Sequence, residues 1–148
     1  MTSKMTRQQP TFDLKTLNRV AQALAETSDL AQVKAIRDRA EAARHNAQCN
    51  GMGLKTQNQA AEVKLRAERR AGKLLAGLIK RGGDRKSTTH NEHLKLSDLG
   101  IDHNQSARWQ REASVPDDVF EEYLAAAKED GKPITASGLL RLKRILAK

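Results

Sequence analysis

Two stretches of the chain carry apolar residues at steps of three or four, and a glycine-containing break separates them. The first stripe comprises Val33, Ile36, Ala40, Ala43 and Ala47. The second stripe comprises Ala60, Val63, Ala67, Ala71, Leu74 and Leu78. This spacing places apolar side chains on one face of an α-helix. Because the break reads Asn50-Gly51-Met52-Gly53, we expect an antiparallel helical hairpin or one long helix kinked at the glycines.

The composition favours an all-α fold. Aromatic residues make up only 3% of the 148 residues, which argues against a β-sandwich or barrel. A further amphipathic helix is expected within residues 12–24, where Leu14, Leu17, Ala21 and Leu24 share a face. Ser28 and Asp29 are candidate N-cap residues for the first helix of the hairpin. The Ala-rich stripes are equally compatible with packing inside one chain and with a coiled-coil dimer seam.

The chain has the features of a cytoplasmic protein. Its single cysteine, Cys49, cannot form an internal disulfide, which fits a reducing compartment. No stretch approaches the roughly 18 apolar residues of a membrane-spanning helix. Residues 1–10 lack the apolar core of a secretory signal. We therefore expect no membrane association.

The excess positive charge lies in one segment. Residues 31–81 contain 12 basic and 4 acidic residues, whereas residues 94–148 contain 9 of each. A concentrated basic helical surface is typical of proteins that contact nucleic-acid phosphates. The expected phosphate-binding residues are Lys64, Arg66, Arg69, Arg70, Lys73, Lys80 and Arg81. The alternatives are an acidic protein partner and a solvated face with ion pairs such as Glu62 with Arg66.

These patterns divide the chain into four parts. We expect an N-terminal tail and short helix over residues 1–29 and a basic helical hairpin or coiled arm over residues 30–81. A polar, glycine-containing linker over residues 82–93 follows. Residues 94–148 are expected to form a small helix-turn-helix domain.

The C-terminal part has the spacing of a helix-turn-helix. A short apolar segment ends at Gly100, and a second helix is expected from Asn104 to about Ser114. Pro116 suits the first turn of the next helix, and Thr135 is a candidate N-cap for the last. We expect these short helices to pack around Trp109 and Phe120 in a core of their own.

The second helix of this motif carries polar residues that can read DNA. Arg recognises guanine, and Asn or Gln recognises adenine, through paired hydrogen bonds in the major groove. The expected base-reading residues are His103, Asn104, Gln105, Arg108 and Arg111.

Two motifs resemble a known group of proteins. Residues 61–75 read AEVKLRAERRAGKLL, and residues 98–110 contain DLGI followed by QSARWQ. Together they resemble a family of small, largely uncharacterised phage, prophage and plasmid proteins. The C-terminal part is also similar to the helix-turn-helix of ParB-type partition proteins. The resemblance implies a DNA-binding role in a mobile element and implies no enzymatic activity.

No other chemistry stands out. His45, Cys49, His90 and His93 have spacings that could hold zinc, but His45 lies in a basic helix and the last two lie in the polar linker. No nucleophile triad, phosphate loop or paired-carboxylate cleft is present in the sequence, and we expect no catalytic residue, metal or cofactor. The sequence predicts a non-enzymatic protein that binds double-stranded DNA as a homodimer. The alternative is a phage-encoded protein-interaction module, either an adaptor or inhibitor of a host protein or an accessory to a DNA modification enzyme.

Overall fold

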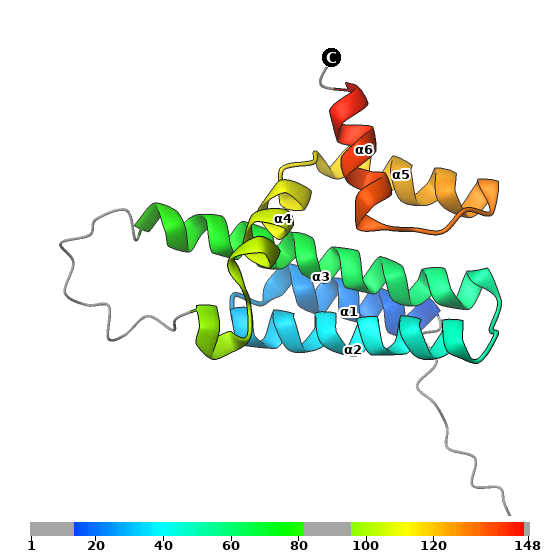
Figure 1. The fold of residues 1–148 in the computed structure, drawn as a ribbon, viewed down its shortest axis with the longest axis horizontal. Helices are drawn as coiled ribbons and strands as arrows, with labels where there is room; N and C mark the ends of the chain where they lie inside the picture. The colour runs from blue at the N-terminus through cyan, green and yellow to red at the C-terminus, as the bar shows by residue number, and fades with distance from the viewer. Residues whose placement is uncertain (1–13, 82–95, 147–148) are drawn as a thin grey trace, which may run out of the picture.

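The computed structural model describes residues 14–81 and 96–146. Within them the fold is all-α, as the sequence predicts (Figure 1). The elements are α1 (Leu14–Glu26), α2 (Leu30–Cys49), α3 (Leu54–Arg81), the 3-10 helix η2 (Leu96–Leu99), α4 (His103–Ala113), α5 (Asp117–Asp130) and α6 (Ala136–Leu146). The expected linker, residues 82–93, lies outside the described residues.

Helices α2 and α3 form the predicted antiparallel hairpin rather than one kinked helix (Figure 1). Asp29 is the N-cap of α2, where its carboxylate accepts a hydrogen bond from the Ala31 N–H at 3.0 Å. The chain reverses at Gly51, whose φ of 68° is in the left-handed region that a glycine adopts without a steric penalty. Val33 and Ala40 of α2 are fully buried, so the predicted stripe is the packing face.

Helix α3 is the centre of the molecule, because α1, α2, α4 and α5 all pack against it. One buried cluster joins Leu24 and Val33 of the N-terminal helices to Ala71 and Leu75 of α3. A second cluster joins Ala61 and Leu65 of α3 to side chains of α5 and α6. The C-terminal helices therefore use α3 as part of their core.

The expectation that Trp109 and Phe120 share one C-terminal core is wrong. Trp109 is 1% exposed and belongs to the first cluster, whose other members include residues of α1, α2 and α3. Phe120 is buried in the second cluster, with Leu65 and Leu124. The two aromatic side chains lie apart because α4 crosses α3 before the chain turns into α5, so each is buried against a different part of α3.

The two local signals predicted for the C-terminal part, Pro116 and Thr135, both lie at helix starts. Pro116 is the N-cap residue of α5, immediately before its first turn, and Gly131 ends that helix with a φ of 66°. At the start of α6, Thr135 Oγ1 accepts a hydrogen bond from the Gly138 N–H at 2.9 Å.

A helix-turn-helix arrangement is not confirmed. The segment before Gly100 is the four-residue 3-10 helix η2, with no α-helix among the described residues between it and α3. Gly100 itself has a φ of 74°, as expected for the turn that leads to α4. The second helix of the expected motif is therefore present as α4. In place of the first helix, the described residues show only the short 3-10 helix η2.

Helix α6 projects from the rest of the molecule at its C-terminal end (Figure 1). Leu139 near its start is fully buried, whereas Ile145 and Leu146 are 61% and 59% exposed. The sequence pattern predicts that all of these side chains face inward. The last turn of α6 extends beyond the helices that cover Leu139, so its apolar residues remain exposed.

Candidate nucleic-acid interface

The outer face of α4 carries four of the five expected base-reading residues. His103, Asn104, Arg108 and Arg111 are all exposed. Successive residues of an α-helix are 100° apart, so these four positions fall on one side of α4. Trp109, Ser106 and Glu112, on the opposite side, are buried. Among the described residues, no carboxylate forms an ion pair with Arg108 or Arg111.

The fifth residue, Gln105, is engaged at the helix start. Its N–H donates to Asp102 Oδ1 at 2.7 Å, and its side-chain oxygen accepts from the Asp102 N–H at 3.2 Å. This reciprocal pair is a capping box, which satisfies two backbone donors that the helix itself leaves open. The side chain of Gln105 is therefore occupied by the capping box. To contact a DNA base, it would have to give up its hydrogen bond to the Asp102 N–H.

A glycine of α3 fixes the position of α4. A Cβ atom at Gly72 would lie 2.0 Å from the Trp109 carbonyl oxygen and 2.9 Å from Ala113 Cβ. Only glycine at this position allows the two helix backbones to approach so closely. Helix α4 therefore lies directly on α3 and presents its polar side to solvent.

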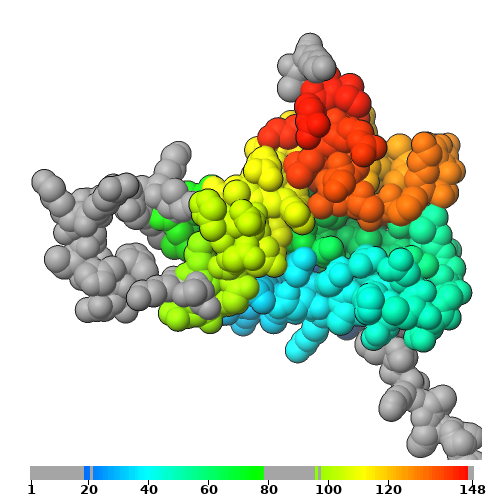
Figure 2. All heavy atoms as spheres, viewed as in Figure 1, coloured from blue at the N-terminus to red at the C-terminus, as the bar shows by residue number. Residues whose placement is uncertain are grey.

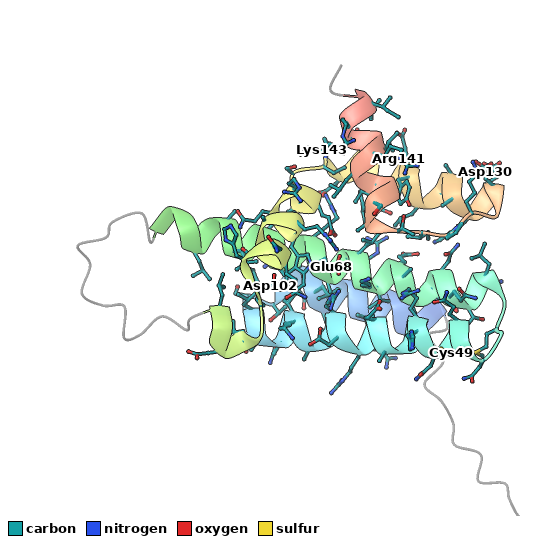
Figure 3. All side chains as sticks on the ribbon, viewed as in Figure 1. Cys49, Glu68, Asp102, Asp130, Arg141 and Lys143 are labelled. Atoms are coloured by element: carbon teal, nitrogen blue, oxygen red, sulfur yellow. The ribbon has the colours of Figure 1, made fainter. Side chains whose placement is uncertain are left out.

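Helix α6 places further cations beside α4. Arg141 and Arg144 are exposed, and no described carboxylate pairs with either. Lys143 donates a hydrogen bond from Nζ to Ser114 Oγ at 2.5 Å, which joins α6 to the C-terminal end of α4. The two helices lie next to one another on the face drawn in Figure 2, and Figure 3 labels Arg141 and Lys143 there. Sequence reasoning missed these residues, although the run Arg141–Arg144 contains three cations in four positions.

The expected phosphate-binding residues of α3 have partners inside the protein. Arg66 binds Glu121 of α5 through both terminal nitrogens, at 2.9 and 3.1 Å, and its Nε donates to Glu62. Lys64 Nζ lies 3.0 Å from Glu41 Oε1 of α2. These contacts join α3 to its neighbours, so neither cation is an unpaired surface charge.

Arg69 is the most deeply placed of these cations. Its side chain donates to the carbonyl oxygens of Glu112 and Val115 at 3.2 and 2.5 Å and to Asp117 at 2.9 Å. The guanidinium also lies 4.3 Å from the centre of the Phe120 ring. Hydrogen bonding from Arg69 lowers the pKa of Asp117. The prediction that Arg69 grips DNA phosphates disagrees with the structure, because its donors hold the junction between α4 and α5.

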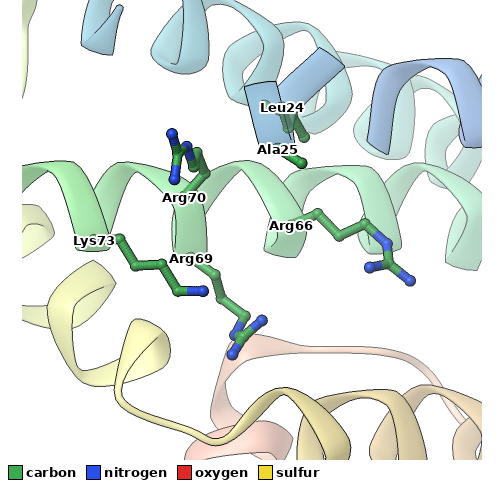
Figure 4. Close-up of a pocket in the computed structure, with 6 residues that line it drawn as sticks. All are labelled: Leu24, Ala25, Arg66, Arg69, Arg70 and Lys73. Carbon is green, nitrogen blue, oxygen red and sulfur yellow. The ribbon is translucent and has the colours of Figure 1, made fainter. Parts of the chain in front are cut away.

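Arg70 and Lys73 complete the α3 set. Arg70 donates twice to the Thr27 carbonyl oxygen, at 3.0 and 2.7 Å, and so ties α3 to the chain between α1 and α2. Lys73 is half exposed, 3.6 Å from Asp117. An open groove of about 270 Å³ runs past these cations, as Figure 4 shows; it is lined by Leu24, Ala25, Arg66, Arg69, Arg70 and Lys73. The side chains of Lys80 and Arg81 are outside the described set.

Two acidic residues of α5 thus offset part of the positive charge of α3. Asp117 and Glu121 turn toward α3, while Arg108, Arg111 and Arg141 remain on the outer surface of α4 and α6. Residues 94–148 contain equal numbers of acidic and basic residues, so their total charge does not reveal that carboxylates face α3 while arginines face solvent. The exposed positive charge therefore extends beyond the arm to α4 and α6.

Two glutamates lie buried between α3 and α4. Glu112 is completely buried, and neither of its oxygens has a hydrogen-bond donor among the described residues; Glu68 Oε1 lacks one as well. Burial, together with the charge of Glu68, raises the pKa of Glu112 to about 9. A proton on Glu112 supplies the missing donor and bonds to Glu68. Arg37 Nε donates to the other Glu68 oxygen at 2.7 Å, and Figure 3 labels Glu68 on α3, next to α4.

The remaining candidate chemistry is limited. His45 Nε2 and Cys49 Sγ are 3.4 Å apart, and His90 and His93 lie outside the described residues. No group of three or more potential metal ligands occurs in the part of the chain that the structure describes. None of the helices described here has both the length and the apolar character that crossing a bilayer requires.

A comparison of the chain with protein-family models, curated proteins and solved structures finds no match.

Proposed function

We propose that the protein binds double-stranded DNA through α4, with α6 contacting the phosphate backbone. The observation that carries the proposal is the outer face of α4, where Asn104, Arg108 and Arg111 are exposed on a helix held rigidly against α3. A helix of this diameter fits the major groove, and Arg and Asn are side chains that distinguish base pairs there. Arg141 and Arg144, on the neighbouring helix, can neutralise phosphates.

This proposal assigns a different role to the basic arm from the one the sequence suggests. Arg66, Arg69 and Arg70 act inside the fold, where they fix the helices that carry the DNA-binding face. Lys73, at the edge of the groove, is the α3 cation best placed to add a phosphate contact. Electrostatic attraction to DNA therefore comes chiefly from α4 and α6.

The test is a measurement of duplex binding by fluorescence anisotropy over a range of salt concentrations. We expect affinity to fall as salt rises, with a log–log slope of about −0.9 for each phosphate neutralised. Sequence preference is measured by selection from a random duplex pool. No binding to any duplex in dilute buffer would reject the proposal.

We also propose that the protein acts as a homodimer and has no enzymatic activity. A single helix reads few base pairs, and two copies on adjacent half-sites are the usual solution. The resemblance to phage and plasmid proteins supports the further proposal that this role belongs to a mobile element and that the protein acts in the bacterial cytoplasm. Light scattering of the purified protein, alone and with duplex, measures the number of copies in each state.

A protein-interaction module is the second candidate. Ile145 and Leu146, exposed at the projecting end of α6, favour it because exposed apolar residues that lie together are typical of protein contacts. This candidate predicts a defined complex with a host or phage protein and no duplex affinity at low salt. The salt titration above therefore separates the two functions.

A further inference from the structure

A second cavity lies on the other side of α3 from the groove of Arg69 and Arg70. It has a volume of about 300 Å³, at the lower end of the range for small-molecule sites. Its walls come from α2, α3, α4, the segment after α5 and the first turn of α6. The cavity is thus built where the hairpin meets the C-terminal helices.

Three cations from three different helices line this cavity. They are Arg44 of α2, Lys64 of α3 and Arg108 of α4. Glu41 contacts two of these cations: Arg44 Nε lies 2.9 Å from Glu41 Oε1, and Lys64 Nζ lies 3.0 Å from the same oxygen. Hydrogen bonding from Arg44, with a further contribution from Lys64, lowers the pKa of Glu41 to about 2. One ionised carboxylate against three cations leaves two positive charges uncompensated.

The nearby buried glutamates do not cancel this charge. Glu112 interacts electrostatically with Lys64 and Arg108, but its pKa of about 9 keeps it protonated and uncharged at neutral pH. Glu68 remains paired with Arg37, which does not line the cavity. The cavity is therefore positive around neutral pH.

The opposite wall is apolar and rigid. Ala61, Leu65 and Ile134 supply apolar surface. Asn58 fixes the segment after α5, because its Nδ2 donates to the Lys132 carbonyl and its Oδ1 accepts from the Ile134 N–H, both at 2.9 Å. Asn58 is 6% exposed, so this wall is set before any ligand arrives.

We propose that this cavity binds a small organic phosphate, with the phosphate against Lys64 and Arg108 and the organic body against the apolar wall. A phosphate monoester carries close to two negative charges at neutral pH, which matches the uncompensated charge of the site. Arg and Lys form strong charge-assisted hydrogen bonds to phosphate oxygens. The apolar wall gives no advantage to inorganic phosphate, so a ligand with an organic body should bind more tightly. This inference stands apart from DNA binding.

The test is calorimetric titration of the full-length protein, without DNA and at constant ionic strength. The probes are adenosine 5′-monophosphate, inorganic phosphate and adenosine. We expect the nucleotide to bind at one site per chain and more tightly than either of its parts. Absence of nucleotide binding, or equal affinity for inorganic phosphate, overturns the proposal.

Matched variants connect the binding to this cavity. Lys64→Gln should weaken nucleotide binding by about tenfold or more, because it removes a charge-assisted hydrogen bond. Lys55→Gln is the control, since Lys55 is an exposed cation on the same helix that does not line the cavity. Ser137→Phe should also weaken binding, because Ser137 is exposed at the rim and a large side chain there obstructs entry without a change in charge. Equal losses in Lys64→Gln and Lys55→Gln would show non-specific attraction and reject the site.

The outcome can be separated from that of the DNA proposal. Arg108 belongs to both surfaces and is not used as a test, whereas Arg111 does not line the cavity. Arg111→Ala is expected to leave nucleotide binding unchanged. A loss of nucleotide binding in Arg111→Ala, in a protein with an unchanged circular dichroism spectrum, would contradict the assignment to the cavity.

Discussion

The backbone of Gly72 meets the backbone of Trp109 where α3 and α4 cross. A Cβ atom at residue 72 would stand 2.0 Å from the Trp109 carbonyl oxygen, well inside van der Waals contact. This crossing both buries the Trp109 ring and sets the height of α4 above α3. The position of the outer face of α4 therefore depends on the absence of a side chain at residue 72 of α3.

Gly72→Ala should destabilise the protein although alanine is the better helix former. The gain in helix propensity is about 1 kcal/mol, whereas forcing a methyl group into backbone contact costs about 1–3 kcal/mol or more. Gly77→Ala is the matched control, because nothing lies within 4 Å of a Cβ there. That variant should gain about 1 kcal/mol. Urea denaturation of both variants measures the difference, and equal stabilisation of the two would contradict the close crossing.

Glu112→Gln should change how stability depends on pH. Because the folded-state pKa of Glu112 is raised to about 9, the native protein takes up a proton on folding above pH 4.5. Stability is therefore lost as pH rises from about 4.5 to about 9, by at most about 1.4 kcal/mol per pH unit from this group. Glutamine keeps a donor for Glu68 without proton uptake.

The expected result is that Glu112→Gln is more stable than the wild type at pH 8 and has a flatter pH profile. Denaturation curves at several pH values between 5 and 9 measure this. Glu122→Gln is the control, because Glu122 is exposed on α5 and should leave the profile unchanged. Parallel profiles for the wild type and Glu112→Gln would mean that Glu112 is ionised in the native state.

Arg69→Ala should lower stability rather than act on DNA contacts directly. The variant leaves the Glu112 and Val115 carbonyl oxygens without their buried donor and removes a cation from the Phe120 ring. We expect a loss of about 3 kcal/mol, since hydrogen bonds to charged groups contribute about 1.5–3 kcal/mol each. Lys73→Ala, one turn away and half exposed, should lose less than about 1 kcal/mol. Thermal unfolding distinguishes these outcomes, and an undiminished midpoint for Arg69→Ala would contradict the structural role.

Two classes of arginine should affect DNA binding differently. Arg108→Ala and Arg111→Ala should reduce discrimination between duplex sequences by about 1–3 kcal/mol at one base position each. Arg141→Ala and Arg144→Ala should weaken binding to all duplexes and reduce the salt slope by about 0.9 each. Arg39→Ala is the control for the loss of one exposed positive charge, because Arg39 lies on α2. Anisotropy on matched specific and random duplexes measures both effects; identical behaviour of the two classes would reject the division of roles.

The sequence by itself determined where the helices begin and end. The 3,4 stripes, the Asp29 cap and the turn at Gly51 are local, since capping and backbone preference depend on residues within a few positions. The same holds for Gly100, Pro116 and Gly131. The exposed side of α4 could also be predicted, because the polar residues repeat at helical spacing.

The tertiary structure decided which faces meet and which charges remain. Trp109 and Phe120 lie in different clusters, and the cations of α3 point to Glu121, Asp117 and carbonyl oxygens far away in the chain. A sequence gives the number of charged residues but not the distances between them. Whether an arginine is free in solvent or paired inside the fold depends on which groups lie within about 4 Å of its guanidinium. For that reason part of the charge of the basic helix is used inside the fold, and exposed cations also lie on α4 and α6, within a segment that contains equal numbers of acidic and basic residues.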